Sequence, residues 1–334
     1  MESFRLLHLS DPHIAVQQKV IGFPDRRHRP QYPLGQLSLS PSSYDLDLAK
    51  AVAKHAFVTG NQLDAILITG DLATVGSAVD LTLTHDYVHA PGLTAPLPGQ
   101  PVWTWAPWLS ASRFPTLESS GAPVVLLPGN HDRFNGWLLH AGGTTFDAIF
   151  AGDWDGRRKA QTLVILQLGT ERLGIIAADF TLQNNADADS LTGGRWAYMG
   201  QGKAYSSIVQ ALVQETQDQQ AQYDALAVVW AVHFPPEFAQ IDPVLRLLDE
   251  HLLVAATKVG AAHLFCGHTH EPRQYALPGN PGVQVYCAGT ATQYCAPPPN
   301  ANSIHPLEID MDGGRIMAVR WRTLLWNQAR KNFA

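Results

Sequence analysis

The chain has 334 residues, of which 46% are hydrophobic and 16% are charged. This composition is typical of a globular protein with a large core, and it shows no bias toward a disordered chain. The net charge of −6 at pH 7 supplies no basic surface for a polyanion, which argues against a nucleic-acid-binding protein. Three cysteines are too few for a disulfide framework, and no apolar run is long enough to cross a membrane.

The first predicted element is a strand at the amino terminus, Phe4-Arg-Leu-Leu-His-Leu-Ser10. No charged region, long apolar region and cleavage site precede it, so we expect a cytoplasmic protein. The strand ends at Asp11, and Pro12 stiffens the turn so that Asp11 and His13 both point beyond the strand end. Alone, Asp-x-His is a weak pattern that occurs in many turns by chance.

A helix and a second strand are predicted next. Apolar residues recur at helical spacing over residues 44–61, and Leu63-Asp-Ala-Ile-Leu-Ile-Thr-Gly-Asp71 is a buried strand that ends in Gly-Asp. A βαβ crossover brings parallel strands to the same sheet edge. We therefore expect the carboxylates of Asp11 and Asp71 to lie together, where two of them invite a pair of cations.

Two segments lack a regular period. The first, which ends near Tyr44, carries three arginines that we interpret as a solvated basic turn rather than as a substrate contact: Arg26, Arg27 and Arg29. The second, residues 75–120, is a Pro- and Trp-rich insertion that could act as a lid. Its tryptophans favour a satellite core over a pocket wall that stacks a base: Trp103, Trp105 and Trp108.

The most informative stretch is Val124-Val-Leu-Leu-Pro-Gly-Asn-His-Asp132. Its apolar, β-branched start predicts a buried strand, and Pro-Gly predicts a tight turn at the sheet edge. Asn130, His131 and Asp132 follow, at the edge where α/β folds bind ligands. Alone, this turn fits a structural role as well as a functional one. The same construction elsewhere in the chain favours the functional interpretation.

The second half of the chain repeats strands that end in polar side chains. Residues 162–180 predict a hairpin with Asp179 in a turn role, and this second set of strands predicts two sheets packed face to face. The strand 225–232 ends in His233, and the strand 262–266 ends in Gly267-His-Thr-His270. His268 and His270 share a face, so they can address one site or two adjacent ones. Helices are predicted at 203–222 and 241–259, and further strands at 282–289 and 307–321.

Collected together, the strand ends present eight nitrogen and oxygen side chains: Asp11, His13, Asp71, Asn130, His131, His233, His268 and His270. A set without thiolate suits Mn, Fe or Zn and argues against a structural zinc site, which favours cysteine. Because these ligands are too many for one ion, they predict two cations about 3.5–4 Å apart, bridged by a carboxylate. Such pairs stabilise the attacking and leaving oxygens in phosphoryl transfer.

Five blocks in this order resemble the calcineurin-like metallophosphoesterase superfamily over nearly the whole chain: Asp11-x-His13, Gly70-Asp71, Gly129-Asn-His-Asp132, His233 and Gly267-His-x-His270. The resemblance implies an α/β fold, namely a four-layer αββα sandwich of two mixed β-sheets flanked by helices. We expect it to form a single domain over residues 1–334. Ala73-Thr74 departs from many members, which carry another polar residue there.

The resemblance also implies a role for each site residue. One metal would be bound by Asp11, His13 and His270, and the other by Asn130, His233 and His268. Asp71 would bridge the two ions. His131 would contact the phosphate and protonate the leaving oxygen, with Asp132 orienting it.

Within the superfamily, the chain is most similar to the bacterial cyclic-nucleotide phosphodiesterase branch. This implies hydrolysis of a small phosphodiester, such as a cyclic nucleotide, by in-line attack of a metal-bridging hydroxide. The expected cofactors are two divalent or mixed-valence transition metal ions (Mn, Fe or Zn), and the expected partner is a small phosphate ester, with no membrane or nucleic acid.

Three alternatives remain open. A phosphomonoesterase would use the same ions. A DNA nuclease is disfavoured by the acidic balance of charge. A non-catalytic metal-binding scaffold for protein partners is disfavoured because the ligand set is complete.

Overall fold

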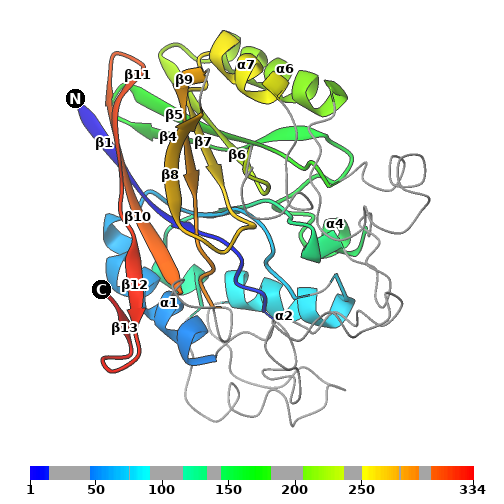
Figure 1. Ribbon diagram of the computed structural model, residues 1–334, viewed down its shortest axis with the longest axis vertical. Helices are drawn as coiled ribbons and strands as arrows, with labels where there is room; N and C mark the ends of the chain where they lie inside the picture. The colour runs from blue at the N-terminus through cyan, green and yellow to red at the C-terminus, as the bar shows by residue number, and fades with distance from the viewer. Residues whose placement is uncertain are drawn as a thin grey trace.

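Two mixed β-sheets packed face to face form the centre of the molecule, with helices on their outer faces (Figure 1). The computed structural model describes residues 1–14, 46–74, 76–90, 116–133, 144–181, 206–236, 250–277, 280–292 and 302–334. The predicted α/β class and the order helix, sheet, sheet, helix are confirmed.

The first sheet has seven strands within the described residues, in the order β13-β12-β10-β1-β2-β3, with β11 paired to β10. Its strands are β1 (Glu2–Leu9), β2 (Ala65–Ile68), β3 (Val124–Leu126), β10 (Ser303–Asp312), β11 (Arg315–Trp321), β12 (Leu324–Asn327) and β13 (Asn332–Phe333). The pairs β1–β2 and β2–β3 are parallel, whereas β10 runs antiparallel to β1. The three parallel strands therefore end at one edge.

The second sheet has six strands within the described ranges, in the order β4-β5-β6-β7-β9-β8. They are β4 (Ala160–Leu168), β5 (Glu171–Ala178), β6 (Leu226–Val232), β7 (His263–Cys266), β8 (Arg273–Leu277) and β9 (Asn280–Cys287). The β4–β5 hairpin is antiparallel, as predicted, and β5 to β9 along the sheet are parallel. Both β2 and β6 are buried along their whole length, which explains their unbroken apolar sequences.

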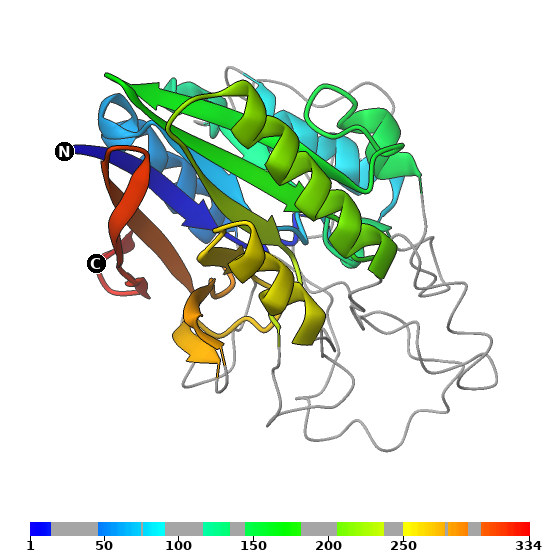
Figure 2. The ribbon, with the colours of Figure 1, turned by 90° about the horizontal axis from the view of Figure 1, so that it is seen from above.

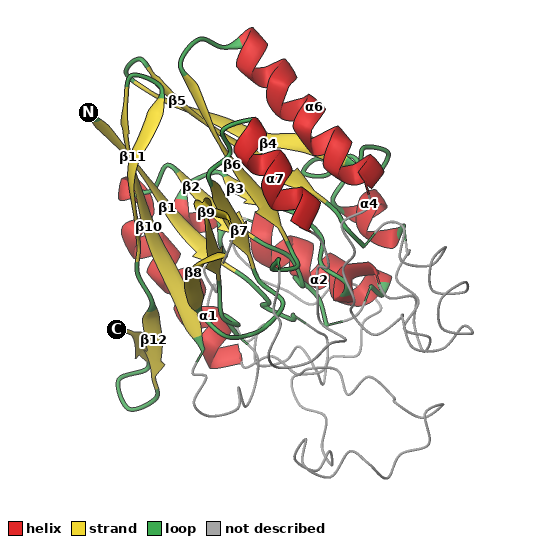
Figure 3. Cartoon of the chain, turned by 45° about the horizontal axis from the view of Figure 1, so that its top comes forward, coloured by secondary structure: helices red, strands yellow, loops and turns green. Residues whose placement is uncertain are grey.

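The helices cover the outer faces of the two sheets (Figure 3). The longer ones are α1 (Leu46–Thr59), α2 (Ala78–His89), α6 (Ser206–Gln222) and α7 (Glu250–Lys258), and α4 (Thr145–Ile149) is a short one. Residues of α1 and α2 share one hydrophobic core with the first sheet and the inner face of the second. Those of α6 and α7 form the other core against the outer face of the second sheet. No helix in the described ranges is long and apolar enough to span a membrane.

The prediction of an irregular insertion over residues 75–120 is wrong in part, because α2 lies within it. The helix begins normally, since the side chain of Ser77 accepts a hydrogen bond of 3.2 Å from the amide of Asp80. Its buried positions include Asp80 and Thr84 beside apolar residues, so the sequence lacks a clean hydrophobic stripe. The three tryptophans of this segment, and the arginines of the segment before α1, fall outside the described residues.

The turns after β1, β2 and β3 of the first sheet contact the turns after β6 and β7 of the second. In Figure 2 the blue strand β1 and the olive strand β6 point toward the same side of the molecule. Backbone hydrogen bonds join neighbouring turns within each sheet: the amide of Asp11 donates to Gly70 and that of Gly267 donates to His233. A third bond joins the sheets, since the amide of His268 donates to the carboxylate of Asp11 over 2.9 Å. The loops that carry the predicted ligands therefore lie against one another.

Candidate metal centre

Backbone strain is concentrated at the predicted ligands. Asp11, His13, Asp71, His268 and His270 all have positive φ angles, between 49° and 69°. Non-glycine residues rarely adopt this region, at a cost of about 1–3 kcal/mol each. Only two other non-glycine residues in the described ranges do so. The sharp turns after β1, β2 and β7 are therefore held in place by their surroundings, as is common at functional sites.

Two glycines allow the loops to approach each other. A side chain on Gly129 would overlap the carboxylate and backbone of Asp71, and one on Gly267 would overlap the side chain of Ser10. The Gly-Asn-His-Asp and Gly-His-x-His turns thus need glycine for close packing across the site.

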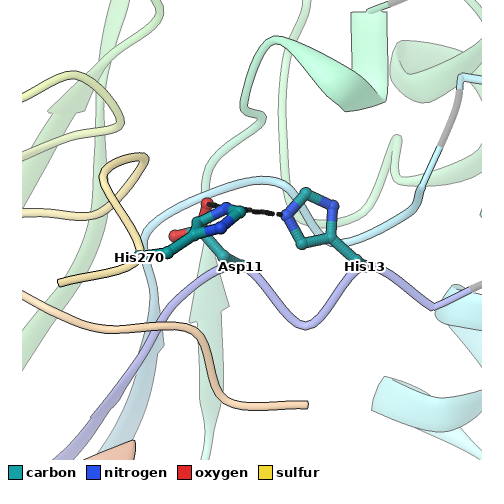
Figure 4. A group of neighbouring side chains, drawn as sticks. All are labelled: Asp11, His13 and His270. Atoms are coloured by element: carbon teal, nitrogen blue, oxygen red, sulfur yellow. Dashed lines mark hydrogen bonds and ion pairs between the residues drawn. The ribbon is translucent and has the colours of Figure 1, made fainter. Parts of the chain in front are cut away.

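The first cluster comprises Asp11 and His13, which follow β1, and His270, which follows β7. Nε2 of His270 lies 3.2 Å from Oδ1 of Asp11 and 3.1 Å from Nε2 of His13. Figure 4 shows the two imidazoles and the carboxylate turned toward one another. All three donor atoms lie within 4.8 Å of each other, as ligands of one ion require.

The second cluster surrounds Nε2 of His233, at the end of β6. This nitrogen lies 3.0 Å from Oδ1 of Asn130, 3.2 Å from Nδ1 of His268 and 3.3 Å from Oδ1 of Asp71. The other ring nitrogen of His233 donates to the carbonyl of Thr69 over 2.8 Å, so Nε2 of the neutral ring carries a lone pair. The lone pair of His233 and the side-chain oxygens of Asn130 and Asp71 therefore converge on one buried space, which is suited to a cation.

Asp71 lies between the two clusters. Its Oδ1 faces His233, and its Oδ2 lies 4.0 Å from Nε2 of His13 and 3.8 Å from Nε2 of His131. The possible ligand triads of the described residues overlap through shared members: Asp11, His13 and His270; His13, Asp71 and His131; and Asp71, His233 and His268. A carboxylate with one oxygen toward each cluster fits a bridging position.

The electrostatics of these buried groups favour cation binding. Burial raises the pKa values of Asp11 and Asp71, but nearby imidazoles outweigh it and hold both pKa values below the usual range. Burial and neighbouring imidazoles lower the pKa of His268 to about 3 and that of His13 well below its usual value. Carboxylates that stay ionised and imidazoles that stay neutral are in the protonation states that metal ligands require.

His233 shows the attraction of the site for positive charge. Burial lowers its pKa, but the carboxylates of Asp71 and Asp11 raise it to about 10. Without another cation, a proton on this ring would neutralise the acidic cluster. A metal ion binding there must displace that proton, so affinity rises with pH.

His131 and Asp132 lie in the short 3₁₀ turn η4 (His131–Arg133) that follows β3. Nδ1 of His131 lies 2.7 Å from the carbonyl oxygen of Thr74, and its side chain is 20% exposed, so a substrate can reach it. The carboxylate of Asp132 instead accepts hydrogen bonds from three backbone amides, those of Leu72, Ala73 and Gly129. These bonds show that Asp132 joins the turns after β2 and β3, and that the His131 ring contacts Thr74. That Asp132 orients His131 stays a prediction.

Arg133 is a residue of this region that the sequence analysis missed. Its side chain is 1% exposed, and its guanidinium donates to Asp179 after β5 and to Asp147 on α4, each over 2.8 Å. Asp179 therefore takes part in a buried ion pair between the two sheets, beyond the turn role expected for it. Local sequence does not distinguish such an arginine from a solvated one, because its partners lie 14 and 46 residues away.

Replacing Arg133 with Met should lower the free energy of unfolding by about 3–5 kcal/mol, because it leaves Asp179 and Asp147 without their cation. Urea denaturation of the metal-free protein measures this. Arg157→Met is the matched control, since Arg157 is 92% exposed in its pair with Asp155 and should change little. Equal midpoints for the two variants would contradict the importance of the buried pair.

Comparisons with known proteins agree with this geometry. The family model described as calcineurin-like phosphoesterase matches residues 4–272. A dimetal phosphatase from Danio rerio has 14% identity and a TM-score of 0.51, with 97% of this chain and 99% of that chain covered. This likeness supports the fold. No curated protein sequence matches the chain.

The chain is also similar to two solved structures of larger proteins. A protein from Staphylococcus aureus proposed to be a 5'-nucleotidase has 13% identity and a TM-score of 0.48, with 97% of this chain covered. A purple acid phosphatase from yellow lupin, Lupinus luteus, has 12% identity and a TM-score of 0.47, with 96% covered. The chain spans about half the length of these two, 54% and 53% respectively.

Proposed function

The chain belongs to the calcineurin-like phosphoesterase family, whose members are metal-dependent phosphoric ester hydrolases, and on that basis we propose that it hydrolyses a small phosphodiester. Cyclic nucleotides are the first candidates, because the Asp-Pro-His start and the Gly-His-Thr-His-Glu-Pro block resemble the phosphodiesterase branch. The observation that carries the proposal is the pair of ligand clusters that share Asp71 between them.

We assign Asp11, His13 and His270 to one ion and Asn130, His233 and His268 to the other, with Asp71 between them. The support is the close approach of their donor atoms, Oδ1 of Asn130 included, together with the protonation states described above for His13 and His268. When bound, the two ions would offset the negative charge of the phosphate. They would also lower the pKa of water, so that hydroxide is available to attack the phosphate near neutral pH.

The chain's own groups would position the ester and complete the proton transfers. His131 is the candidate acid, because its Nε2 points to the Asp71 side of the site and its side chain is partly exposed. In that role Nε2 would give a proton to the departing oxygen, which lowers the barrier most for poor leaving groups. Asp132 would stabilise the turns after β2 and β3 rather than contact substrate, because its carboxylate accepts hydrogen bonds from the amides of Leu72, Ala73 and Gly129.

The pairing of two described arginines, Arg133 and Arg273, favours a diester over a monoester. A phosphomonoester carries one more negative charge than a diester at neutral pH and benefits from an additional cation. Arg133 is paired with Asp179 and Asp147, and Arg273 lies 2.6 Å from Glu271. Both arginines that follow site motifs in the sequence are thus already neutralised by carboxylates.

The proposal is tested with metal-stripped protein reloaded with Mn, Fe or Zn and assayed against a panel of esters. The panel comprises bis-p-nitrophenyl phosphate, p-nitrophenyl phosphate, cyclic AMP, cyclic GMP and single-stranded DNA. We expect metal-dependent turnover of the diesters that exceeds turnover of the monoester, and a cyclic nucleotide as the best natural substrate. Preference for p-nitrophenyl phosphate would reassign the chain to the phosphatases. Silence across the panel with two ions bound would contradict the phosphodiesterase proposal.

A further inference from the structure

Thr74 contacts two different parts of the site at once. It is fully buried in the turn after β2. Its hydroxyl donates to the carbonyl of His13 over 2.6 Å, and its amide donates to the carbonyl of Ile14 over 2.9 Å. Its own carbonyl lies 2.7 Å from Nδ1 of His131. Thr74, in the turn after β2, thus forms hydrogen bonds both with the turn after β1 and with the ring of His131.

The contact with His131 determines where the proton of that ring lies. A backbone carbonyl can only accept a hydrogen bond, so Nδ1 of His131 must be the N–H donor. Nε2 of the neutral ring is then the unprotonated nitrogen, and it is presented toward Asp71 at 3.8 Å from Oδ2. This arrangement leaves Nε2 able to take up a proton from water, which makes the ring an imidazolium, and then to give that proton to a leaving oxygen.

The contact with His13 acts on the backbone. His13 has a φ of 49°, in the region that side chains rarely adopt, and its carbonyl is held by the Thr74 hydroxyl. The rings of His13 and His131 lie edge to face, with centroids 4.7 Å apart. A shift of either turn would therefore move one ring against the other.

We propose that Thr74 is a positioning residue for the reaction. Its hydroxyl holds His13 in the orientation needed for the first metal ion, and its carbonyl fixes the plane and the tautomer of His131. The effect on turnover rests on the proposed function, whereas the tautomer is a property of the protein alone. The two can therefore be tested separately.

The first test is the tautomer of His131 in the metal-free wild-type protein. Two-bond ¹H–¹⁵N correlation spectra distinguish the two tautomers of a neutral histidine, and loss of the signal in His131→Gln assigns it. We expect the Nδ1–H form in wild type and in Thr74→Ser. We expect a mixture of forms in Thr74→Val, because without the hydroxyl bond to the carbonyl of His13 the turn that carries the Thr74 carbonyl is no longer held against the His131 ring. An Nε2–H tautomer in the wild type would overturn the proposal whether or not the protein is an active hydrolase.

The second test compares aryl phosphodiesters whose leaving groups differ in pKa. Thr74→Val should lose about 10–100-fold in kcat/KM, as is usual when a residue supporting metal ligands is removed. The loss should be greatest for the poorest leaving groups, and Thr74→Ser should restore most of the activity. Thr84→Val is the matched control, because Thr84 is equally buried and its hydroxyl donates to the carbonyl of Asp80, within α2.

A structural role alone would lower all rates by the same factor and leave the leaving-group dependence unchanged. If the wild type is active and Thr74→Val shows the same dependence of kcat/KM on leaving-group pKa, the positioning role would be overturned. Equal losses in Thr74→Val and Thr84→Val would do the same. Absence of hydrolysis by the wild type would contradict the proposed function instead, and the tautomer measurement would still decide the role of Thr74.

Discussion

Replacing Asp71 with Asn should lower phosphodiester turnover by about 10³-fold, since it removes several kcal/mol of charge stabilisation at a two-metal site. The two carboxylate oxygens of Asp71 face different clusters, and an amide offers only one acceptor oxygen and no charge. Asparagine is the most conservative choice, because its oxygen can still accept the hydrogen bond of 2.8 Å from the amide of His131.

Steady-state rates and metal content, measured by mass spectrometry on the same reloaded samples, check this prediction. We expect the variant to hold fewer than two ions per chain. Asp218→Asn is the control, because Asp218 is exposed on α6 and accepts a hydrogen bond from Gln214, one turn earlier in the same helix. An Asp71→Asn protein with two ions and wild-type turnover would show that Asp71 does not bridge the clusters.

Replacing His131 with Ala should lower turnover by about 10²–10⁴-fold while leaving two ions bound, because positioned acids contribute factors of this size. The ring contacts the carbonyl of Thr74 and projects toward the Asp71 side of the site, where its 20% exposed side chain can meet an ester. A poor alkoxide leaving group should suffer more than an activated nitrophenolate, which departs without a proton.

His89→Ala provides the control for this variant. His89 also pairs with an acidic group, 2.9 Å from Asp153, but it lies on α2 and outside the ligand clusters. Its loss should leave turnover unchanged. If metal content and turnover both fell in His131→Ala, His131 would have to be a ligand of the ions, as its place in a triad with His13 and Asp71 permits.

The sequence was sufficient to predict which strand ends converge. Each predicted ligand follows an apolar run that stops at a turn signal, and parallel strands must deliver their ends to one edge. The structure accordingly brings Asp11, His13 and His270 together, and places Asn130 and His268 around His233. The hairpin of the second sheet was predictable because β4 and β5 are adjacent in the chain and joined by a short turn.

Contacts between distant segments could not be predicted from local pattern. The carboxylate of Asp132 accepts hydrogen bonds from amides 59 and 60 residues away in the turn after β2, which no pattern near Asp132 indicates. The partners of Arg133 and Thr74 are likewise set by how the turns pack. The helix α2 was missed for a different reason, since the buried polar groups on it disrupt the apolar period that indicates a helix.

The most direct test of a two-metal phosphoesterase centre is a titration of metal-free protein with Mn, in which bound ions and the rate of bis-p-nitrophenyl phosphate hydrolysis are measured together. We predict no hydrolysis without metal, two ions per chain at saturation, and a rate that rises with occupancy of the second ion. Full hydrolysis by the metal-free protein, or saturation at a single ion with full activity, would contradict the centre described here.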